Sequence, residues 1–187
     1  MRKGSRGLAR IPRLDIAGSS GNHSIIVRKP AASKQWEDTL GRVQVQSTDP
    51  NLLQTFYTAL YHASLAPVII SDVDGQYRGP DGKVHQAQAF NYYSTLSLWD
   101  TFRTEHPLIT LVQPGRVNDI ISTMLLHFKY SGNNTLPVWT ESGKENWSMI
   151  GNHSIPVIAD AYFKGFRKWD ANEALADMVA STEQRRG

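Results

Sequence analysis

The longest regular pattern of apolar positions lies between Pro114 and Gly132. Its apolar side chains recur at i, i+3, i+4, i+7, i+8 and i+11, at Val117, Ile120, Ile121, Met124, Leu125 and Phe128. An α-helix places such positions along one stripe of its surface. Proline fits the first turn of a helix, and glycine often follows its last residue. The pattern therefore predicts a helix from Pro114 to about Gly132 with one buried face.

Two helices are predicted before this one. The first begins at Pro50, where Asp49 can cap it, and apolar residues then recur at helical spacing. The second runs from Thr95 to about Glu105, and Pro107 is expected to end it.

Two more helices are predicted after it. One begins at Ser154, a suitable cap residue, and ends near Gly165. The other begins at Asp170, with Glu173 three residues later, a spacing that resembles a capping box. The chain therefore reads as a succession of helices over its second half.

The pattern before residue 50 is weaker. Residues 1–30 are rich in glycine, serine and arginine without a sustained period, and we expect them to form a basic leader. Helical spacing begins in the segment 31–41. Val43 and Val45 then alternate with polar neighbours, which predicts a short strand.

The connections between the predicted helices are long, above all residues 66–93, where Asp74-Gly75 and Asp81-Gly82 are turn signals. These connections carry most of the Trp, Asp, Glu and His residues. Long loops in a compact helical domain are more often functional than idle. We predict a mainly α fold, compatible with part of an α/α toroid, with short strands and long loops.

Composition excludes several classes of protein. The chain has 187 residues, enough for one domain with a sizeable core, and no cysteine. Disulfides, a thiol nucleophile and thiolate zinc sites are therefore excluded. No apolar run has transmembrane length, and the N-terminus lacks the apolar centre of a secretory signal. As written, the chain is expected to be cytoplasmic, without a membrane partner.

The formal net charge is +3, and much of the excess lies in the first thirteen residues. The bases there, with no acid among them, are Arg2, Lys3, Arg6, Arg10 and Arg13. A basic arm can bind nucleic acid. No aromatic residue lies among these bases and no basic stripe follows on a helix, so we favour a solvated terminus and expect no nucleic-acid partner.

The first segment with candidate chemistry runs from Ser71 to Arg78 and contains Asp-x-Asp-Gly at Asp72. Such a sequence can open a calcium loop, but the complete motif needs a further ligand before the glycine and a closing glutamate. Both are missing here. A hairpin turn with Asp74-Gly75 at its tip is the favoured interpretation. A sugar contact from Asp72 or Arg78 remains open.

The second segment places Trp99, Asp100 and Arg103 within five residues. An indole offers a flat apolar face to a sugar ring, and the two charged side chains can hydrogen-bond its hydroxyls. Spacing alone slightly favours another interpretation, a buried tryptophan beside an i, i+3 ion pair. Both interpretations stay open at this point.

The third segment contains Glu141, Glu145 and His153. Glycoside hydrolysis typically needs one carboxylic acid to protonate the leaving oxygen and a second carboxylate to attack or to activate water. Trp147 can provide an apolar wall that desolvates Glu145 and keeps it protonated. A solvated charged loop is the alternative, and the residue pattern alone favours it.

Other chemistries find little support. His153 and Asp160 are seven residues apart and can share a helix face, but two ligands do not make a metal site. The Gly-x-Ser-x-Gly motif of serine hydrolases is absent. No glycine-rich phosphate loop stands between a strand and a helix.

Residues from about Trp36 to Met178 resemble glycoside hydrolase family 92, the exo-acting α-mannosidases. The matching stretches occur in the family's order and are Phe56–His62, Ser71–Gly79, Tyr93–Arg103, Leu136–Trp139, Met149–His153 and Asp160–Gly165. The resemblance implies that residues 31–187 are the N-terminal part of the catalytic domain, cut short at the C-terminus. That domain would be an (α/α)6 toroid that follows a β-sandwich domain, and the sandwich and the rest of the toroid would be missing here.

The resemblance also implies a function. Family members hydrolyse terminal α-mannosides with calcium and with inversion, typically as α-1,2-mannosidases acting on high-mannose N-glycans or fungal mannans. The expected partner is a mannose-containing oligosaccharide, and the calcium ligands would lie outside this chain. Members are often periplasmic or secreted, so the resemblance leaves the compartment open.

The resemblance assigns Glu145 as the general acid, in a segment like Gly-x-Glu-Thr-x-Cys-Met. Asn146 and Ser148 replace the family's threonine and cysteine. The expected sugar contacts are Trp99, Asp100, Arg103, Asp72, Trp147 and His153. The family's general base lies in a Gly-Asn-Asp-Asp-like segment that this sequence lacks. We therefore expect this chain to be inactive alone; the alternative is a non-catalytic mannose-binding or remnant domain without the base.

Overall fold

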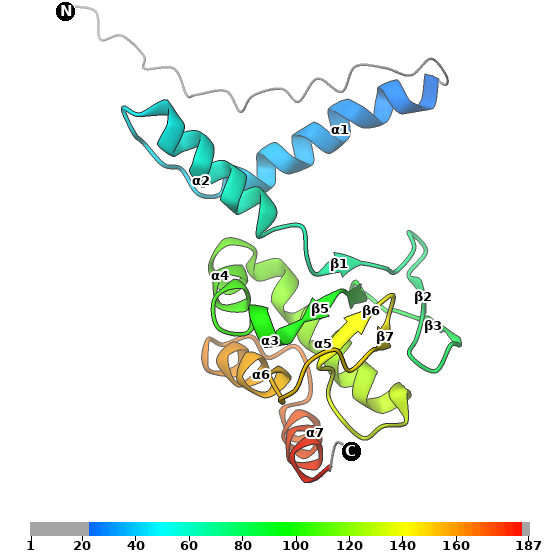
Figure 1. Ribbon diagram of the computed structural model, residues 1–187. Helices are drawn as coiled ribbons and strands as arrows, with labels where there is room; N and C mark the ends of the chain where they lie inside the picture. Colours follow the sequence, from blue (N-terminus) through cyan, green and yellow to red (C-terminus); the bar gives the residue numbers. More distant parts are fainter. Residues whose placement is uncertain (1–22, 185–187) are drawn as a thin grey trace, which may run out of the picture. The chain divides into compact units, whose positions relative to one another are not determined.

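The computed structural model describes residues 23–184, with side chains from Pro30 onward (Figure 1). The chain divides into two compact units, one ending at Gln46 and the other beginning at Ser47. The helices are α1 His23–Leu40, α2 Pro50–His62, α3 Leu98–Thr101, α4 Glu105–Val112, α5 Pro114–Ser131, α6 Ser154–Phe163 and α7 Ala171–Glu183. The strands are β1 Val68–Ile69, β2 Gln76–Arg78, β3 Val84–Gln86, β4 Tyr93–Ser94, β5 Leu96–Ser97, β6 Trp139–Glu141 and β7 Lys144–Glu145. Helices dominate and no strand exceeds three residues in the described part, so the mainly α prediction is confirmed.

The first unit contains α1, which begins at His23, inside the segment 1–30 that we expected to be a leader. Residues 1–22 of that leader lie outside the described part of the chain. The helix ends before Gly41, as predicted. The predicted strand at Val43 and Val45 is wrong, because this segment follows the helix end as irregular backbone. Two alternating residues are too few to specify a strand without a paired edge.

The second unit begins with α2, whose start is as predicted. The Asp49 carboxylate accepts a hydrogen bond of 2.8 Å from the N–H of Asn51, and Pro50 lies in the first turn. The same rule holds at α7, where the Asp170 carboxylate accepts from the N–H groups of Asn172 and Glu173 at 2.8 and 3.0 Å. In both helices a side chain satisfies donors that have no partner within the helix.

The predicted helix from Thr95 to Glu105 is wrong. Thr95 has a φ of 62° and joins two short strands, and the segment then forms α3 and, after a break, α4. Pro107 lies in the first turn of α4 and does not end a helix. The first N–H groups of a helix have no acceptor within it, so a proline is tolerated there.

The start of α6 also differs from the prediction. Ser154 is the first helical residue and His153 holds the cap position. The Ser154 hydroxyl, fully buried, donates to the carbonyl of Pro137 instead of capping the helix. This bond ties α6 to the segment that leads into β6.

The core of the second unit lies along α5, as its apolar stripe predicts. Val117, Ile120, Ile121, Met124 and Leu125 are buried, and Phe128 packs against the same cluster. Residues of α4, α6 and α7 also belong to this cluster, as do Tyr93, Leu96 and Leu98 of β4, β5 and α3. The helix ends at Gly132, which has a φ of 73°, a conformation that glycine adopts without strain.

Three small antiparallel sheets lie beside the helices: β1 with β4, β2 with β3, and β5 with β6 and β7 (Figure 1). The tip of the β2–β3 hairpin is Asp81-Gly82. Asp74-Gly75 was expected at a hairpin tip, but it forms a turn before β2, in which the Gly75 N–H donates to the Asp72 carbonyl. In the part of the chain that the structure describes, no helix has both the length and the apolar character to cross a membrane.

Candidate functional site

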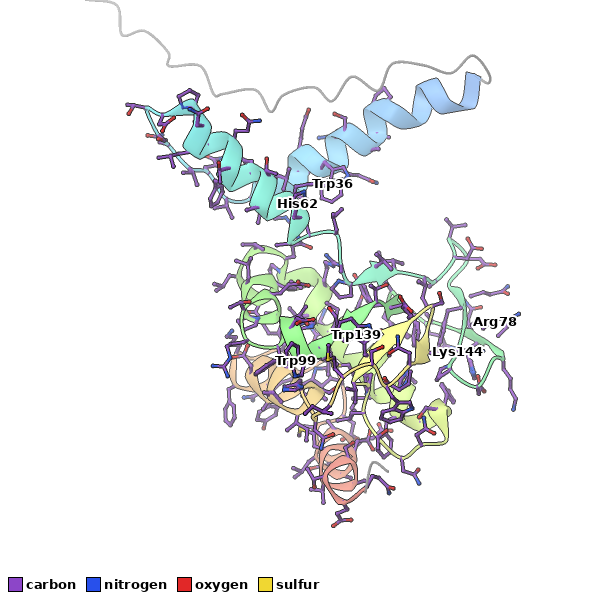
Figure 2. The ribbon with its side chains drawn as sticks, in the orientation of Figure 1. Trp36, His62, Arg78, Trp99, Trp139 and Lys144 are labelled. Atoms are coloured by element: carbon purple, nitrogen blue, oxygen red, sulfur yellow. The ribbon has the colours of Figure 1, made fainter. Side chains whose placement is uncertain are left out.

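The three-stranded sheet β5–β6–β7 brings together two of the segments with candidate chemistry. Ser97 pairs with Trp139, and Thr140 pairs with Glu145. The turn that joins β6 to β7 is tied down, because the Gly143 N–H donates to the buried Ser94 hydroxyl at 2.8 Å. The chain leading into Trp99 therefore lies directly beside the β6–β7 hairpin that carries Glu145. Figure 2 labels Trp99 on α3, Trp139 on β6 and Lys144 on β7.

The Glu145 carboxylate is held by the backbone on both of its oxygens. It accepts hydrogen bonds from the backbone N–H groups of Val138, Trp139 and Trp147, at 2.6, 3.0 and 3.0 Å. An ionised carboxylate has acceptor sites for all three, whereas a protonated carboxyl must donate from one oxygen. A protonated Glu145 can keep these acceptor contacts only if its O–H points away from the three donors, so donation to a leaving oxygen needs an open direction at one carboxyl oxygen. The interpretation of a solvated charged loop is wrong for Glu145. Its side chain is half-buried, and both carboxylate oxygens accept hydrogen bonds.

Two tryptophans of the candidate segments are open to solvent. Trp99 is 44% exposed and Trp147 is 42% exposed. Trp147 has a φ of 57°, a left-handed conformation that costs energy in a residue with a side chain. Exposed indoles with a polar group nearby are suited to stacking on sugar rings.

The charged residues beside Trp99 do not form the ion pair that their spacing suggested. Asp100 and Arg103 are both exposed, and within residues 30–184 no ion pair joins them. The Arg103 guanidinium lies over the Phe102 ring at 5.3 Å from its centroid. The interpretation of a buried tryptophan beside an ion pair is therefore wrong, and both charged groups face solvent.

His153 packs its ring against Phe102, with 4.5 Å between the ring centroids. The chain turns tightly around the imidazole at Gly151, where a Cβ atom would lie 2.4 Å from a ring carbon and the φ is 93°. The buried Nδ1 atom has no hydrogen-bond partner in the described part of the chain. His153 thus links the end of α3 to the start of α6, and one ring nitrogen is left unpaired.

In the described part of the chain, no hydrogen bond or ion pair joins the Asp72 side chain to Trp99, Glu145 or His153. The Asp72 carboxylate is exposed and accepts from the N–H of Val73 at 2.9 Å. Among the described residues, no group of three or more His, Asp or Glu side chains is placed to hold a metal ion.

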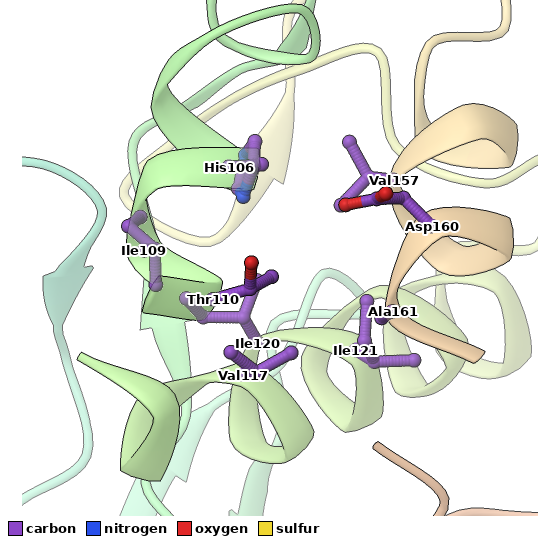
Figure 3. Close-up of a pocket in the computed structure, with 9 residues that line it drawn as sticks. All are labelled: His106, Ile109, Thr110, Val117, Ile120, Ile121, Val157, Asp160 and Ala161. Atoms are coloured by element: carbon purple, nitrogen blue, oxygen red, sulfur yellow. The ribbon is translucent and has the colours of Figure 1, made fainter. Parts of the chain in front are cut away.

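A small cavity lies between α4, α5 and α6, with a volume of about 10 Å³ (Figure 3). Its wall includes His106, Thr110 and Asp160. The Lys164 ammonium closes the rim by donating to Asp160 at 2.7 Å and to Thr110 at 3.0 Å. This volume holds about one water molecule, so the cavity is too small for a sugar.

The structure also reveals an acid that the sequence patterns did not indicate. One carboxyl oxygen of Glu105, at the start of α4, is buried without a hydrogen-bond partner in the described residues. Burial raises the pKa of Glu105 to about 7, against the opposing effect of the Arg116 guanidinium. That guanidinium is itself held by Gln113 at 2.6 Å and by the Tyr93 hydroxyl at 3.3 Å.

Glu105→Gln is expected to raise the free energy of unfolding more at pH 8 than at pH 5. Because the folded protein keeps a proton that the unfolded chain releases, the wild type loses stability as the pH rises from about 4.5 to 7. Removing that titration should stabilise the chain at pH 8 by roughly 1–3 kcal/mol relative to pH 5. Urea unfolding at both pH values measures the difference. The buried His106 and His127 are present in both proteins, so their own titrations largely cancel, and a gain that is equal at both pH values would contradict the assignment to Glu105.

The chain belongs to glycosyl hydrolase family 92. The model of the family's catalytic domain matches residues 21–187, beginning before the boundary at Ala31 that the sequence patterns gave. The resemblance seen in the sequence is thereby confirmed.

Solved α-mannosidases of this family have the same fold over the matched region. The α-mannosidase BT3965 from Bacteroides thetaiotaomicron is 37% identical with a TM-score of 0.81, over 84% of this chain and 21% of its own length. Its complex with mannoimidazole gives 38% identity and a TM-score of 0.80, over 83% of this chain and 20% of that one. The inverting mannosidase BT2199 from Bacteroides thetaiotaomicron VPI-5482 is 33% identical with a TM-score of 0.78, over 87% and 22%. No curated protein matches the chain. The chain therefore spans about a fifth of the length of these solved relatives.

Proposed function

We propose that this chain is part of an enzyme that hydrolyses terminal α-mannosides by an inverting, calcium-dependent mechanism of the α-1,2 type. The observation that carries the proposal is the match to solved α-mannosidases, one in complex with mannoimidazole and another described as inverting. In the complete protein, the helices described above would form part of an (α/α)6 toroid beside a β-sandwich domain.

In this proposal the exposed faces of Trp99 and Trp147 stack on the sugar, and Asp100 and Arg103 bind its hydroxyls. Glu145 protonates the leaving oxygen. An inverting enzyme also needs a base carboxylate roughly 6.5–9.5 Å from the acid. That base and the calcium ligands would come from the remainder of the protein; among the described residues, no group of three or more His, Asp or Glu side chains is placed to hold a metal ion.

The complete protein is expected to release mannose from α-1,2-linked mannobiose. Proton NMR of the first product formed should show the β-anomer, and a chelator of calcium should abolish turnover. The 187-residue chain alone should be inactive. The α-anomer as first product, full activity in chelator or turnover by the isolated chain would each contradict the part of the proposal concerned.

A non-catalytic mannose-binding role is the alternative, and one observation favours it. The Glu145 carboxylate already accepts three N–H bonds, which suits a residue that only holds the β6–β7 hairpin in place. Binding of mannobiose by the complete protein without any turnover would support this alternative.

A further inference from the structure

A groove of about 520 Å³ lies on the second unit, apart from the residues around Glu145. We name it the outer groove. One side of α5, the loop 88–90 and the segment 168–173 line it. It shares no residue with the group of Trp99, Glu145 and Trp147. Its volume is in the range of sites that take small ligands.

Hydrogen bonds hold both walls of the outer groove. On one wall, the backbone N–H of Lys168 donates to the Asn118 side chain at 3.0 Å. Next to the other wall, Asn91 donates to the Asp119 carboxylate through its backbone N–H at 3.0 Å and its amide at 3.1 Å. The walls are therefore fixed to α5 before any ligand arrives, which lowers the entropy cost of binding.

The lining of the outer groove combines aromatic and polar groups. Phe90 comes from one wall and Trp169 from the other, and both are half-buried. Several polar side chains have no hydrogen bond or ion pair to other described residues: Gln88, Ser122, Lys168 and Glu173. Donors, acceptors and both signs of charge are thus present together.

This mixture favours one class of ligand. An anion would meet the carboxylates of Asp119, Asp170 and Glu173, and a cation would meet the ammonium groups of Lys129 and Lys168. A neutral molecule rich in hydroxyls can pair with donors and acceptors alike and place its apolar ring faces on the aromatic side chains. We propose that the outer groove binds a segment of a neutral oligosaccharide. This proposal is independent of the proposed hydrolytic function.

The test uses α-mannotriose and maltotriose as probes, with isotope-labelled 187-residue chain and amide NMR. We expect one or both probes to shift the signals of Asn118, Ser122 and Lys168. Replacing Gln88 and Glu173 together by alanine should weaken this binding about fivefold or more, because each loses a hydrogen bond to the sugar. Glu183→Ala, at the far end of α7, removes the same charge from the same helix outside the groove and should leave the affinity unchanged.

Several results would overturn the proposal. If neither probe shifts these signals at about 10 mM, an oligosaccharide site is excluded. That concentration is far above a Kd of about 1 mM, which corresponds to a binding free energy of roughly 4 kcal/mol. Equal effects of the double variant and of Glu183→Ala would assign the binding to another surface. Binding by the 187-residue chain that the complete protein lacks would mean that the remainder of the polypeptide covers the groove. These binding measurements do not depend on mannosidase activity. A failure of the proposed function would appear in the turnover assay of the complete protein and not in these NMR shifts.

Discussion

Glu145→Gln in the complete enzyme is expected to lower the turnover of unactivated α-mannosides by about 10²-fold or more, the scale that general acid catalysis contributes. Glutamine keeps the size of the side chain but has no proton to give to the leaving oxygen. A substrate whose leaving group needs no protonation, such as a dinitrophenyl mannoside, should retain most of its rate. Comparing kcat for the two substrates therefore isolates proton donation.

The hydrogen bonds of Glu145 make this control necessary. The carboxylate accepts from Val138 through one oxygen and from Trp139 and Trp147 through the other. A glutamine amide nitrogen cannot accept, so at least one N–H is left without its partner, which costs about 1–3 kcal/mol when buried. If the role is only structural, both substrates lose rate equally. Glu183→Gln, an exposed carboxylate at the end of α7, is the matched control and should leave both rates unchanged.

The geometry of Glu145 also shows why local sequence patterns predict only part of the site. The sequence indicates two carboxylates near tryptophan. The three backbone N–H bonds to the Glu145 carboxylate, however, depend on how β6 and β7 pair and on the turn at Gly143, which has a φ of 79°. Glu105 was missed for a similar reason. Nothing in its neighbours along the chain shows that packing will bury one of its carboxyl oxygens. Such features arise from tertiary contacts, which a local pattern does not contain.

Helices were predicted well where a long period or a cap specified them. The stripe of α5 repeats over several turns, and Asp49 and Asp170 both cap their helices as expected. The wrong helix boundaries are those predicted from a single residue that is compatible with two positions in a helix. From the sequence, Pro107 predicts the end of a helix, but a proline is equally suited to a first turn, and only the tertiary structure distinguishes the two.

Ile121→Ala is expected to cost roughly 2–5 kcal/mol of unfolding free energy, the range for removing a large aliphatic side chain from a core. Ile121 is 0% exposed at the centre of the cluster that α5 forms with α4, α6 and α7. The loss combines the transfer of apolar surface to water with a cavity that rigid helices cannot fill. Urea unfolding of the 187-residue chain, followed by circular dichroism, measures the change.

Leu111→Ala is the matched control for this core substitution. Leu111 lies on α4, one of the helices that form the same cluster, but its side chain is 76% exposed. Its replacement should change the unfolding free energy by no more than about 0.5 kcal/mol, as is usual for surface positions. Because both variants shorten an aliphatic side chain, their difference reports burial and little else. Equal effects of the two substitutions would mean that the stability of the unit does not come from the stripe of α5.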